Sequence, residues 1–201
     1  WYDLFAPVPS AAVGGADGES GAAPAWTWER CSEFIPRMFD TLSTEMGDFA
    51  RRAFREGWID ATPRPGKVGG AYCTSLPLVK ESRIMCNFDG SFDSVSTVAH
   101  ELGHAWHSEV MKDIDGVNRE YPMTLAETAS IFSETLVFRA ALAEAPAGER
   151  ASVLDTYLMG ASQVIVDILS RFHFETALMR ARPKGELSPR ELTEMMLDAQ
   201  A

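Results

Sequence analysis

The chain has 201 residues, 46% of them hydrophobic, and its 29 acidic and 18 basic residues give a formal net charge of −11 at pH 7. This length and composition can form a sizeable buried core, either as one domain or as two small ones. The acidic balance argues against a nucleic-acid partner, which would need clustered Lys and Arg, and the sequence shows no apolar run that approaches a membrane span.

The first third of the chain is predicted to contain an irregular connector followed by helical structure. Residues 8–24 are rich in Ala, Gly, Ser and Pro, which is typical of a connector without a packed element. Residues 27–62 are predicted to be helical, with Thr27 as a suitable N-cap and a Pro- and Gly-rich segment closing the region. The apolar residues at helical spacing are Phe34, Met38, Leu42, Phe49 and Phe54.

Residues 67–90 are predicted to form a β-hairpin. Two short extended stretches, Val68 to Ser75 and Arg83 to Phe88, flank one turn, and Asp89-Gly90 provides a second. A glycine-rich edge strand can bind an extended substrate backbone by strand addition. The glycines could also serve only a bulge or tight packing.

The cysteine content indicates reduced thiols. Cys31, Cys73 and Cys86 are odd in number and lack metal-ligand spacing, which suits a cytoplasmic protein better than a disulfide framework. Cys73 and Cys86 could face each other across the hairpin, or they could be two small half-buried strand residues. We therefore expect a cytoplasmic location.

The helix predicted after the hairpin carries the most informative motif of the chain, His100-Glu101-Leu102-Gly103-His104. Residues four apart lie on the same face of a helix, so two imidazoles can share one tetrahedral zinc ion. Glu101 could then accept a proton from a zinc-bound water, whose pKa falls to roughly 7, and pass it to a leaving amine. The motif predicts a zinc peptidase, although a bare match also occurs on helices that carry two surface histidines.

The surroundings of the motif favour a cleft over an open surface. Apolar residues at i, i+3, i+4 and i+7 spacing form one face of this helix, which excludes both histidines. That face comprises Val95, Val98, Ala99, Leu102, Trp106 and Val110. A second stripe gathers the polar residues Asp93, Thr97, His100, His104 and His107. Gly103 costs about 1 kcal/mol relative to alanine inside a helix, which indicates a close helix crossing. His107 lies one turn beyond His104, too far to bind the same ion.

Glu127 is the candidate third zinc ligand, 23 residues after His104 (127 − 104) near the start of another predicted helix. Catalytic zinc usually takes three protein ligands and one water, and two histidines with one glutamate are a recurring set. The alternative is a capping box that pairs Glu127 with Thr124. Glu134 and Asp93 could each hold the free N–H of a zinc-bound histidine, or they could be ordinary polar helix residues.

Two more helices are predicted in the last third of the chain. Residues 149–179 read as one long helix, and Ser188-Pro189-Arg190-Glu191 starts the final one as a capping box with proline at the first helical position. His173 is expected to be a partly buried structural histidine. The apolar pattern of the long helix comprises Leu154, Leu158, Val164, Ile168 and Phe172.

Several of these segments together resemble one family. The run Asp93–His104, followed by Leu125–Ser130, resembles the oligoendopeptidase F branch of the thimet oligopeptidase family of zinc metallopeptidases. Gly66–Tyr72 resembles the glycine-rich segment that precedes the metal helix in these enzymes, and Trp1–Pro7 resembles the Tyr-Asp-Leu-Tyr opening of their catalytic region. The similarity therefore runs over nearly the whole chain.

The resemblance implies a fold and a metal site. The fold would be mainly α-helical, a zincin-like catalytic core with a small β-hairpin or sheet beside the metal helix, and residues 1–201 would be part of one metallopeptidase catalytic domain. One Zn²⁺ per chain would be held by His100, His104 and Glu127, with Glu101 as the general base. The substrate would be an oligopeptide cleaved at internal bonds in a deep channel.

The resemblance also bears on substrate contacts and on extent. It favours a substrate-binding role for Gly70, Ala71 and Tyr72. Family members are several hundred residues long, and a segment after the part seen here supplies His and Tyr side chains to the substrate. No tyrosine follows Tyr157 and the last histidine is His173, so the chain resembles a catalytic-core fragment. We expect other parts of the full-length enzyme to pack against it, and we expect it to lack full activity alone.

Two functions of different classes follow from the sequence. The first is a zinc-dependent endopeptidase in which Glu101 activates the attacking water. The alternative is a non-catalytic, zinc-stabilised helical domain that binds peptides without turning them over.

Overall fold

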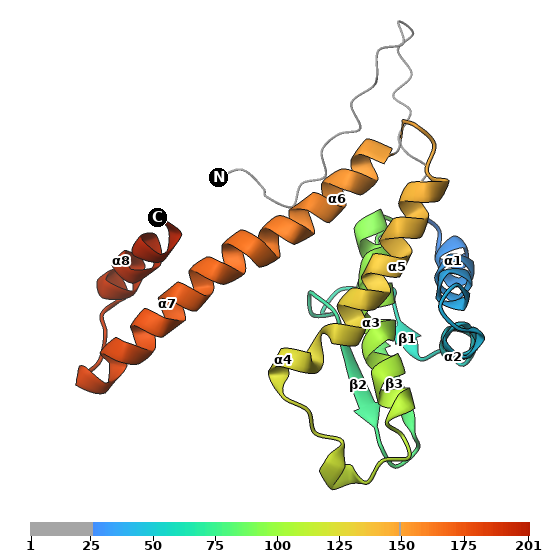
Figure 1. Ribbon diagram of the computed structural model, residues 1–201, viewed down its shortest axis with the longest axis horizontal. Helices are drawn as coiled ribbons and strands as arrows, with labels where there is room; N and C mark the ends of the chain where they lie inside the picture. The colour runs from blue at the N-terminus through green and yellow to red at the C-terminus, as the bar shows by residue number, and fades with distance from the viewer. Residues whose placement is uncertain (1–25, 149) are drawn as a thin grey trace, which may run out of the picture. The chain divides into compact units, whose positions relative to one another are not determined.

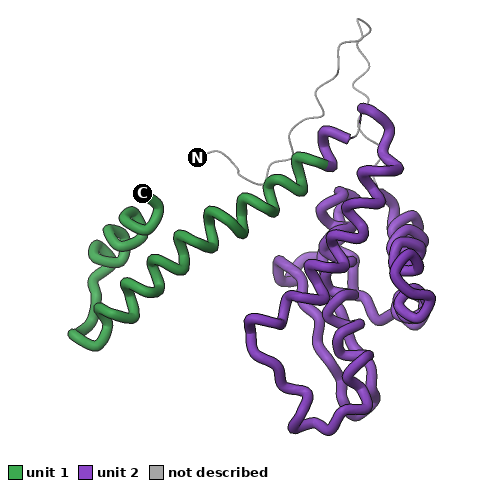
Figure 2. Tube along the Cα trace, in the orientation of Figure 1, with its two compact units in different colours: residues 1–8, 154–201 green, residues 9–153 purple. Residues whose placement is uncertain are grey.

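The computed structural model describes residues 26–148 and 150–201. The predicted connector at residues 8–24 and the Trp1–Pro7 segment lie outside the described residues. The chain divides into two compact units, whose described parts run to Val153 and from Leu154 onward (Figure 2).

The larger unit combines helices with a small sheet (Figure 1). Its elements are α1 (Trp28–Asp40), α2 (Thr44–Arg55), β1 (Ile59–Asp60), β2 (Tyr72–Leu76), β3 (Glu81–Met85), α3 (Phe92–Val110), a 3₁₀ turn (Gly116–Asn118), α4 (Met123–Ala126), α5 (Thr128–Glu144) and the first turn of α6 (Arg150–Ser162). The predicted fold class, mainly α-helical with a small sheet, is confirmed.

The helical region predicted over residues 27–62 is two helices and a strand, so the prediction is wrong in its extent. Thr27 caps α1 as predicted, and its hydroxyl accepts a hydrogen bond from the Arg30 amide at 3.1 Å. The chain then turns at residues 41–43, where the Thr41 hydroxyl donates to the Met38 carbonyl oxygen at the end of α1 and Ser43 caps the start of α2. Leu42, which the sequence pattern groups with the apolar residues of these helices, lies in this turn and is 51% exposed.

The sheet has three strands in the order β1-β3-β2. β2 and β3 form the predicted hairpin, antiparallel and with Tyr72 opposite Met85, and β1 pairs with β3 in parallel. Among the described strands, β2 therefore lies at an edge. The strands occupy Tyr72–Leu76 and Glu81–Met85, both shifted from the predicted stretches. The first strand begins later than predicted because residues 66–70 form a loop that side chains hold in place.

The three cysteines do not pair in this fold. The register places Cys73 opposite Ile84, so Cys73 and Cys86 do not face each other across the hairpin. Cys31 and Cys86 are buried, Cys73 is half-buried, and all three are free thiols. Burial raises the pKa of Cys31 to about 12, so this thiol stays protonated and unreactive at neutral pH.

The core of the larger unit lies where α1, α2, α3 and α5 meet the sheet. The apolar face predicted for α3 is largely buried, since Val95, Val98 and Leu102 are fully enclosed. Each such side chain contributes roughly 1.5–3 kcal/mol when removed from water. Trp106 packs edge-on against Phe49 with ring centroids 5.4 Å apart. The face ends at the last turn of α3, which reaches solvent.

α3 and α5 pack closely against each other at Gly103 (Figure 1). A Cβ added at Gly103 would lie 2.6 Å from the Ala129 carbonyl oxygen and 2.7 Å from the Ser130 Cα. Only glycine allows backbones this close. The close helix crossing predicted from Gly103 is confirmed, and it joins the two helices that carry the candidate site residues.

In the smaller unit, α6 runs through a π-helical turn (Gln163–Asp167) into α7 (Ile168–Ala181), which a 3₁₀ turn (Arg182–Lys184) and α8 (Pro189–Gln200) follow. The capping box predicted at the start of α8 is confirmed, since Ser188 and Glu191 bond each other's backbone amides. His173 is exposed and not partly buried as predicted. The apolar residues of the predicted pattern are also exposed in this unit.

The continuous helix Arg150–Lys184 is long and apolar enough, by length and composition only, to cross a membrane. This contradicts the expectation that no apolar run approaches that length. One such helix is weak evidence for a membrane location. The helix also carries an ion pair between Arg171 and Asp167 at 2.8 Å, and ionised groups are costly in hydrocarbon.

Candidate metal centre

Three side chains converge beside the α3–α5 crossing. His100 and His104 lie one turn apart on α3, and Glu127 lies at the bend between α4 and α5. The two Nε2 atoms are 3.1 Å apart, and each lies 3.2 Å from Oε2 of Glu127. These three residues form the candidate metal-binding cluster of the described chain.

The geometry of this cluster fits a single cation. Ligand atoms bound tetrahedrally at about 2.0–2.1 Å from zinc lie about 3.3–3.4 Å apart, close to the separations of 3.1 and 3.2 Å observed here. Two imidazole nitrogens and one carboxylate oxygen form a donor set that zinc accepts. The sequence prediction had grouped these same three residues, and the fold brings them together.

Glu127 does not form the capping box considered as the alternative. α4 begins after Pro122 without a side-chain cap, and Glu127 closes that short helix instead of lying in its first turn. Its Oε2 accepts a hydrogen bond from the Ser130 hydroxyl at 2.7 Å. Hydrogen bonds and the nearby histidines lower the pKa of Glu127 against the opposing effect of burial, so the carboxylate is ionised and available as a ligand.

Glu134 holds the other side of His100. Its Oε1 contacts Nδ1 of His100, while Nε2 of the same ring faces Glu127. A carboxylate can only accept, so Nδ1 carries the proton and the Nε2 lone pair is left for a cation when the ring is neutral. Burial lowers the pKa of His100, but the hydrogen bond and charge of Glu134 outweigh it and raise the pKa overall.

Asp93, the other candidate for this supporting role, is not brought to the cluster. It is an exposed residue in the first turn of α3. Among the described residues, no hydrogen bond joins its carboxylate to His100 or His104. Glu134 and Asp93 thus differ because Glu134 faces the metal helix across the crossing, whereas Asp93 lies almost two turns before His100.

Glu101 lies next to the cluster and is the most enclosed of the candidate groups. The residue is 5% exposed, and its Oε2 atom is buried without a hydrogen-bond partner among the described residues. Burial raises its pKa, and the charges of Glu127 and Glu134 add to that effect. An unpartnered buried carboxylate oxygen is costly, and a water molecule bound at the cluster would satisfy it.

The segment Gly70-Ala71-Tyr72 leads into the edge strand β2. Gly70 has a φ of +80°, which favours glycine, and Tyr72 is exposed. The next residue, Cys73, has a pKa raised to about 12 by burial first and then by the charge of Glu101. The strand packs against α3, the helix that carries Glu101, although none of these three predicted substrate residues bonds to the metal cluster.

Two contacts at the site escape sequence reasoning. Ser130 is fully buried and bonds Glu127, and its only signal is the i, i+3 spacing from that residue. Tyr121 stacks on His107 with ring centroids 4.5 Å apart, and no pattern in the sequence joins these two residues. His107 itself stays outside the metal cluster, as its position one turn beyond His104 predicts.

A family model for peptidase family M3 matches residues 37–165, which include every member of the metal cluster. The chain belongs to peptidase family M3. This is a metallopeptidase family, and the predicted resemblance to its oligoendopeptidase F members is confirmed.

Relatives within the M3 family are much longer than this chain. An oligoendopeptidase F homologue of Mycoplasma genitalium is 32% identical over 56% of this chain and 19% of its own length. The group B oligopeptidase PepB of Streptococcus agalactiae is 30% identical over 78% of this chain and 26% of its own length. The chain spans about a fifth to a quarter of these curated relatives.

Solved structures support the M3 fold. A structure described as an oligoendopeptidase F from Bacillus anthracis superposes with a TM-score of 0.72 at 19% identity, covering 84% of this chain and 30% of that one. At this identity the likeness concerns the fold alone. It agrees with the mainly helical architecture and small sheet derived above.

Proposed function

We propose that this M3 chain is the catalytic part of a zinc-dependent endopeptidase that hydrolyses internal peptide bonds of oligopeptides. The observation that carries the proposal is the triangle of His100, His104 and Glu127 with the unpartnered buried oxygen of Glu101 beside it. The names of the relatives, which are oligopeptidases, support peptides as substrates.

Each residue of the site then has a chemical role. Zinc held by His100, His104 and Glu127 would polarise the scissile carbonyl and lower the pKa of a bound water. The Glu101 carboxylate takes the proton from the attacking water and passes it to the leaving amine. Burial raises the pKa of Glu101, which brings this base closer to the proton affinity its task needs. Glu134 orients His100 and keeps its proton on Nδ1.

The substrate is proposed to lie along the edge strand β2. Gly70, Ala71 and Tyr72 would bind an extended peptide backbone by strand addition, and the packing of β2 against α3, the helix that carries Glu101, supports this. The matched segments of 114 and 158 residues cover only 19% and 26% of two M3 relatives, so these relatives are much longer than the chain. We infer that residues 1–201 are part of one catalytic domain, and that other parts of the enzyme cover the exposed apolar side of α6 and α7.

The decisive experiment uses the full-length enzyme, because residues 1–201 are expected to lack full activity alone, and compares it with its Glu101→Gln variant. Glu186→Gln, which changes an exposed glutamate outside the site, is the matched control. Zinc content and cleavage of a fluorogenic peptide are measured together. We expect about one zinc per chain in all three proteins and at least about 100-fold slower cleavage in Glu101→Gln alone. Comparable cleavage by Glu101→Gln would refute its role as base. Zinc with peptide bound and recovered intact in every protein would favour the non-catalytic peptide-binding domain.

A further inference from the structure

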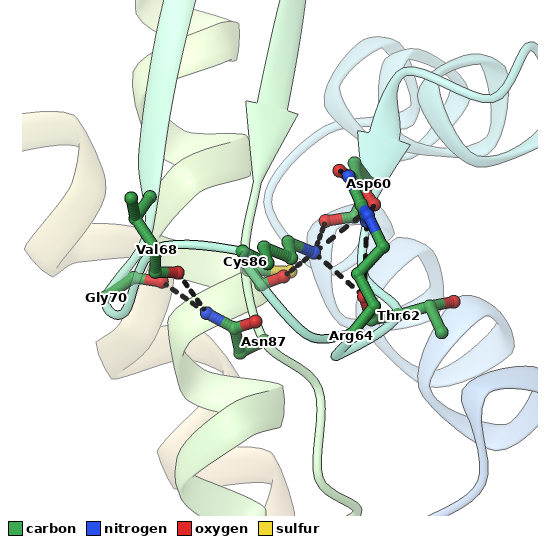
Figure 3. Close-up of polar contacts among 8 residues, drawn as sticks. Asp60, Thr62, Arg64, Val68, Gly70, Cys86 and Asn87 are labelled. Carbon is green, nitrogen blue, oxygen red and sulfur yellow. Dashed lines mark hydrogen bonds and ion pairs between the residues drawn. The ribbon is translucent and has the colours of Figure 1, made fainter.

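Lys67 lies in the glycine-rich segment before β2. Its side chain is the most buried of the cations that form the described ion pairs of the larger unit. Its side chain is 3% exposed. Nζ donates to the backbone oxygens of Asp60 at 2.8 Å, Thr62 at 3.1 Å and Cys86 at 2.6 Å, and lies 3.2 Å from the Asp60 carboxylate (Figure 3). A buried ammonium is tolerated only when it is paired and fully hydrogen-bonded, as it is here.

Asn87 adds a second anchor to the same segment. Its side-chain amide donates to the carbonyl oxygens of Val68 at 2.9 Å and Gly70 at 3.3 Å (Figure 3). Cys86 and Asn87 directly follow β3 and lead toward the first turn of α3. Lys67 and Asn87, here called the loop latch, therefore tie residues 66–70 to the chain that enters the metal helix.

The segment held by the loop latch would have little to order it otherwise. It contains Gly66, Gly69 and Gly70, and ladder pairing with β3 starts only at Tyr72. Glycine loses more conformational freedom on ordering than any other residue. A Cβ added at Gly69 or Gly70 would meet nothing within 4 Å, so neighbouring side chains do not pack over these residues. Their position depends on the loop latch.

We propose that Lys67 and Asn87 are positioning residues for substrate, which hold Gly70, Ala71 and Tyr72 in place to receive an extended peptide backbone. This inference rests on the proposed function. Pre-ordering an edge strand lowers the entropy that peptide binding has to overcome. The loop latch acts through the backbone of this edge and touches neither the metal ligands nor Glu101.

The test uses variants in a zinc-loaded Glu101→Gln background, so that a bound peptide is not consumed. Lys67→Met removes the ammonium, and Asn87→Ala removes only the two carbonyl contacts and covers the case in which Lys67→Met fails to fold. Arg64→Met is the matched control, because Arg64 pairs with the same Asp60 carboxylate at 2.7 Å from an exposed position. Amide hydrogen exchange, zinc content and binding of an end-blocked fluorescent peptide of about ten residues are measured.

We expect amide exchange in residues 68–73 to quicken roughly tenfold or more in both latch variants, and peptide affinity to fall about tenfold, with zinc content unchanged. Arg64→Met should match the parent in all three measurements. Unchanged exchange in Asn87→Ala and in folded Lys67→Met, or faster exchange with unchanged peptide affinity, would overturn the positioning role alone. No peptide binding in the parent would overturn the peptide site of the proposed function, and the positioning role with it.

Discussion

Replacing Gly103 by alanine tests whether the α3–α5 crossing sets the metal site. The added Cβ would lie 2.6 Å from the Ala129 oxygen, about 0.8 Å short of the 3.4 Å at which ordinary van der Waals contact begins. The Ser133 hydroxyl, 2.7 Å away, can rotate, but the Ala129 and Ser130 atoms belong to the backbone. The clash is relieved only if α5 moves away from α3.

The free energy of unfolding should fall by a modest amount in Gly103→Ala. Overpacking of this kind costs about 1–3 kcal/mol, and the better helix propensity of alanine returns about 1 kcal/mol. We therefore expect a net loss of up to about 2 kcal/mol. The larger effect should be on zinc affinity, because Glu127 and Glu134 would move with α5 while the histidines stay on α3. Misplacing such groups costs at least about tenfold in metal affinity.

Urea unfolding and zinc competition with a chromophoric chelator measure these two effects. Gly160→Ala is the matched control, because Gly160 lies within α6 and a Cβ there would meet nothing within 4 Å. That variant should be unchanged or slightly stabilised, with full zinc affinity. If Gly103→Ala behaved like Gly160→Ala in both assays, the crossing would not control the site and the reasoning would be refuted.

Three further predictions follow from the site and the loop latch. Glu134→Gln should weaken zinc binding about 10- to 100-fold in a metal-competition titration, whereas Asp93→Asn, without a bond to either histidine, should not; equal effects would contradict the assignment of Glu134. Chelation should lower the unfolding free energy of the wild-type chain by about 2.7 kcal/mol when zinc was present at 100 times its Kd, and should leave His104→Ala unaffected; a chelator effect on that variant would argue against the site. Hydrogen bonds from Arg64 and Lys67 hold the folded pKa of Asp60 down at about 2, so its stabilising effect is present above the unfolded value of 3.8 and is lost as pH falls toward 2. The difference in urea midpoint between wild type and Asp60→Asn should therefore shrink between pH 5 and pH 2, and a constant difference would refute this.

The helical segments show where sequence periodicity stops being informative. The apolar spacing over residues 34–54 predicts helical structure, but it does not show where one helix ends and the next begins. The break depends on Thr41 and Ser43, whose hydroxyls bond nearby backbone groups. Such residues occur inside helices as well as at their ends. The turn therefore becomes visible only when α1 and α2 pack against the rest of the core.

The hairpin is a second case in which local sequence patterns predict an element but not its bounds. Gly, Pro and β-branched residues predict its existence, but its strands begin and end at other residues than predicted. The Lys67 side chain bonds backbone oxygens of residues 60, 62 and 86, and the Asn87 side chain bonds those of residues 68 and 70. These bonds hold residues 66–70 in a loop outside the strand ladder. These partners are up to 19 residues away. Composition within a short window carries no information about such contacts.

The cytoplasmic location and the one-domain organisation stay predictions. Composition decides neither the location nor the domain organisation, as the helix from Arg150 to Lys184 shows. Its exposed apolar residues would suit a membrane-spanning helix and would equally suit a surface that other protein covers. Fractionation of cells that express the full-length protein would test the location directly.

The sequence by itself determined the candidate metal-binding pair and the proposed base. His100, Glu101 and His104 lie within two turns of one helix, and helix geometry is local, so their arrangement follows from spacing alone. Only the tertiary structure decided the rest. Glu127 and Glu134 reach the histidines because Gly103 lets α5 approach α3 at backbone distance, and this is a contact between segments that no local rule relates.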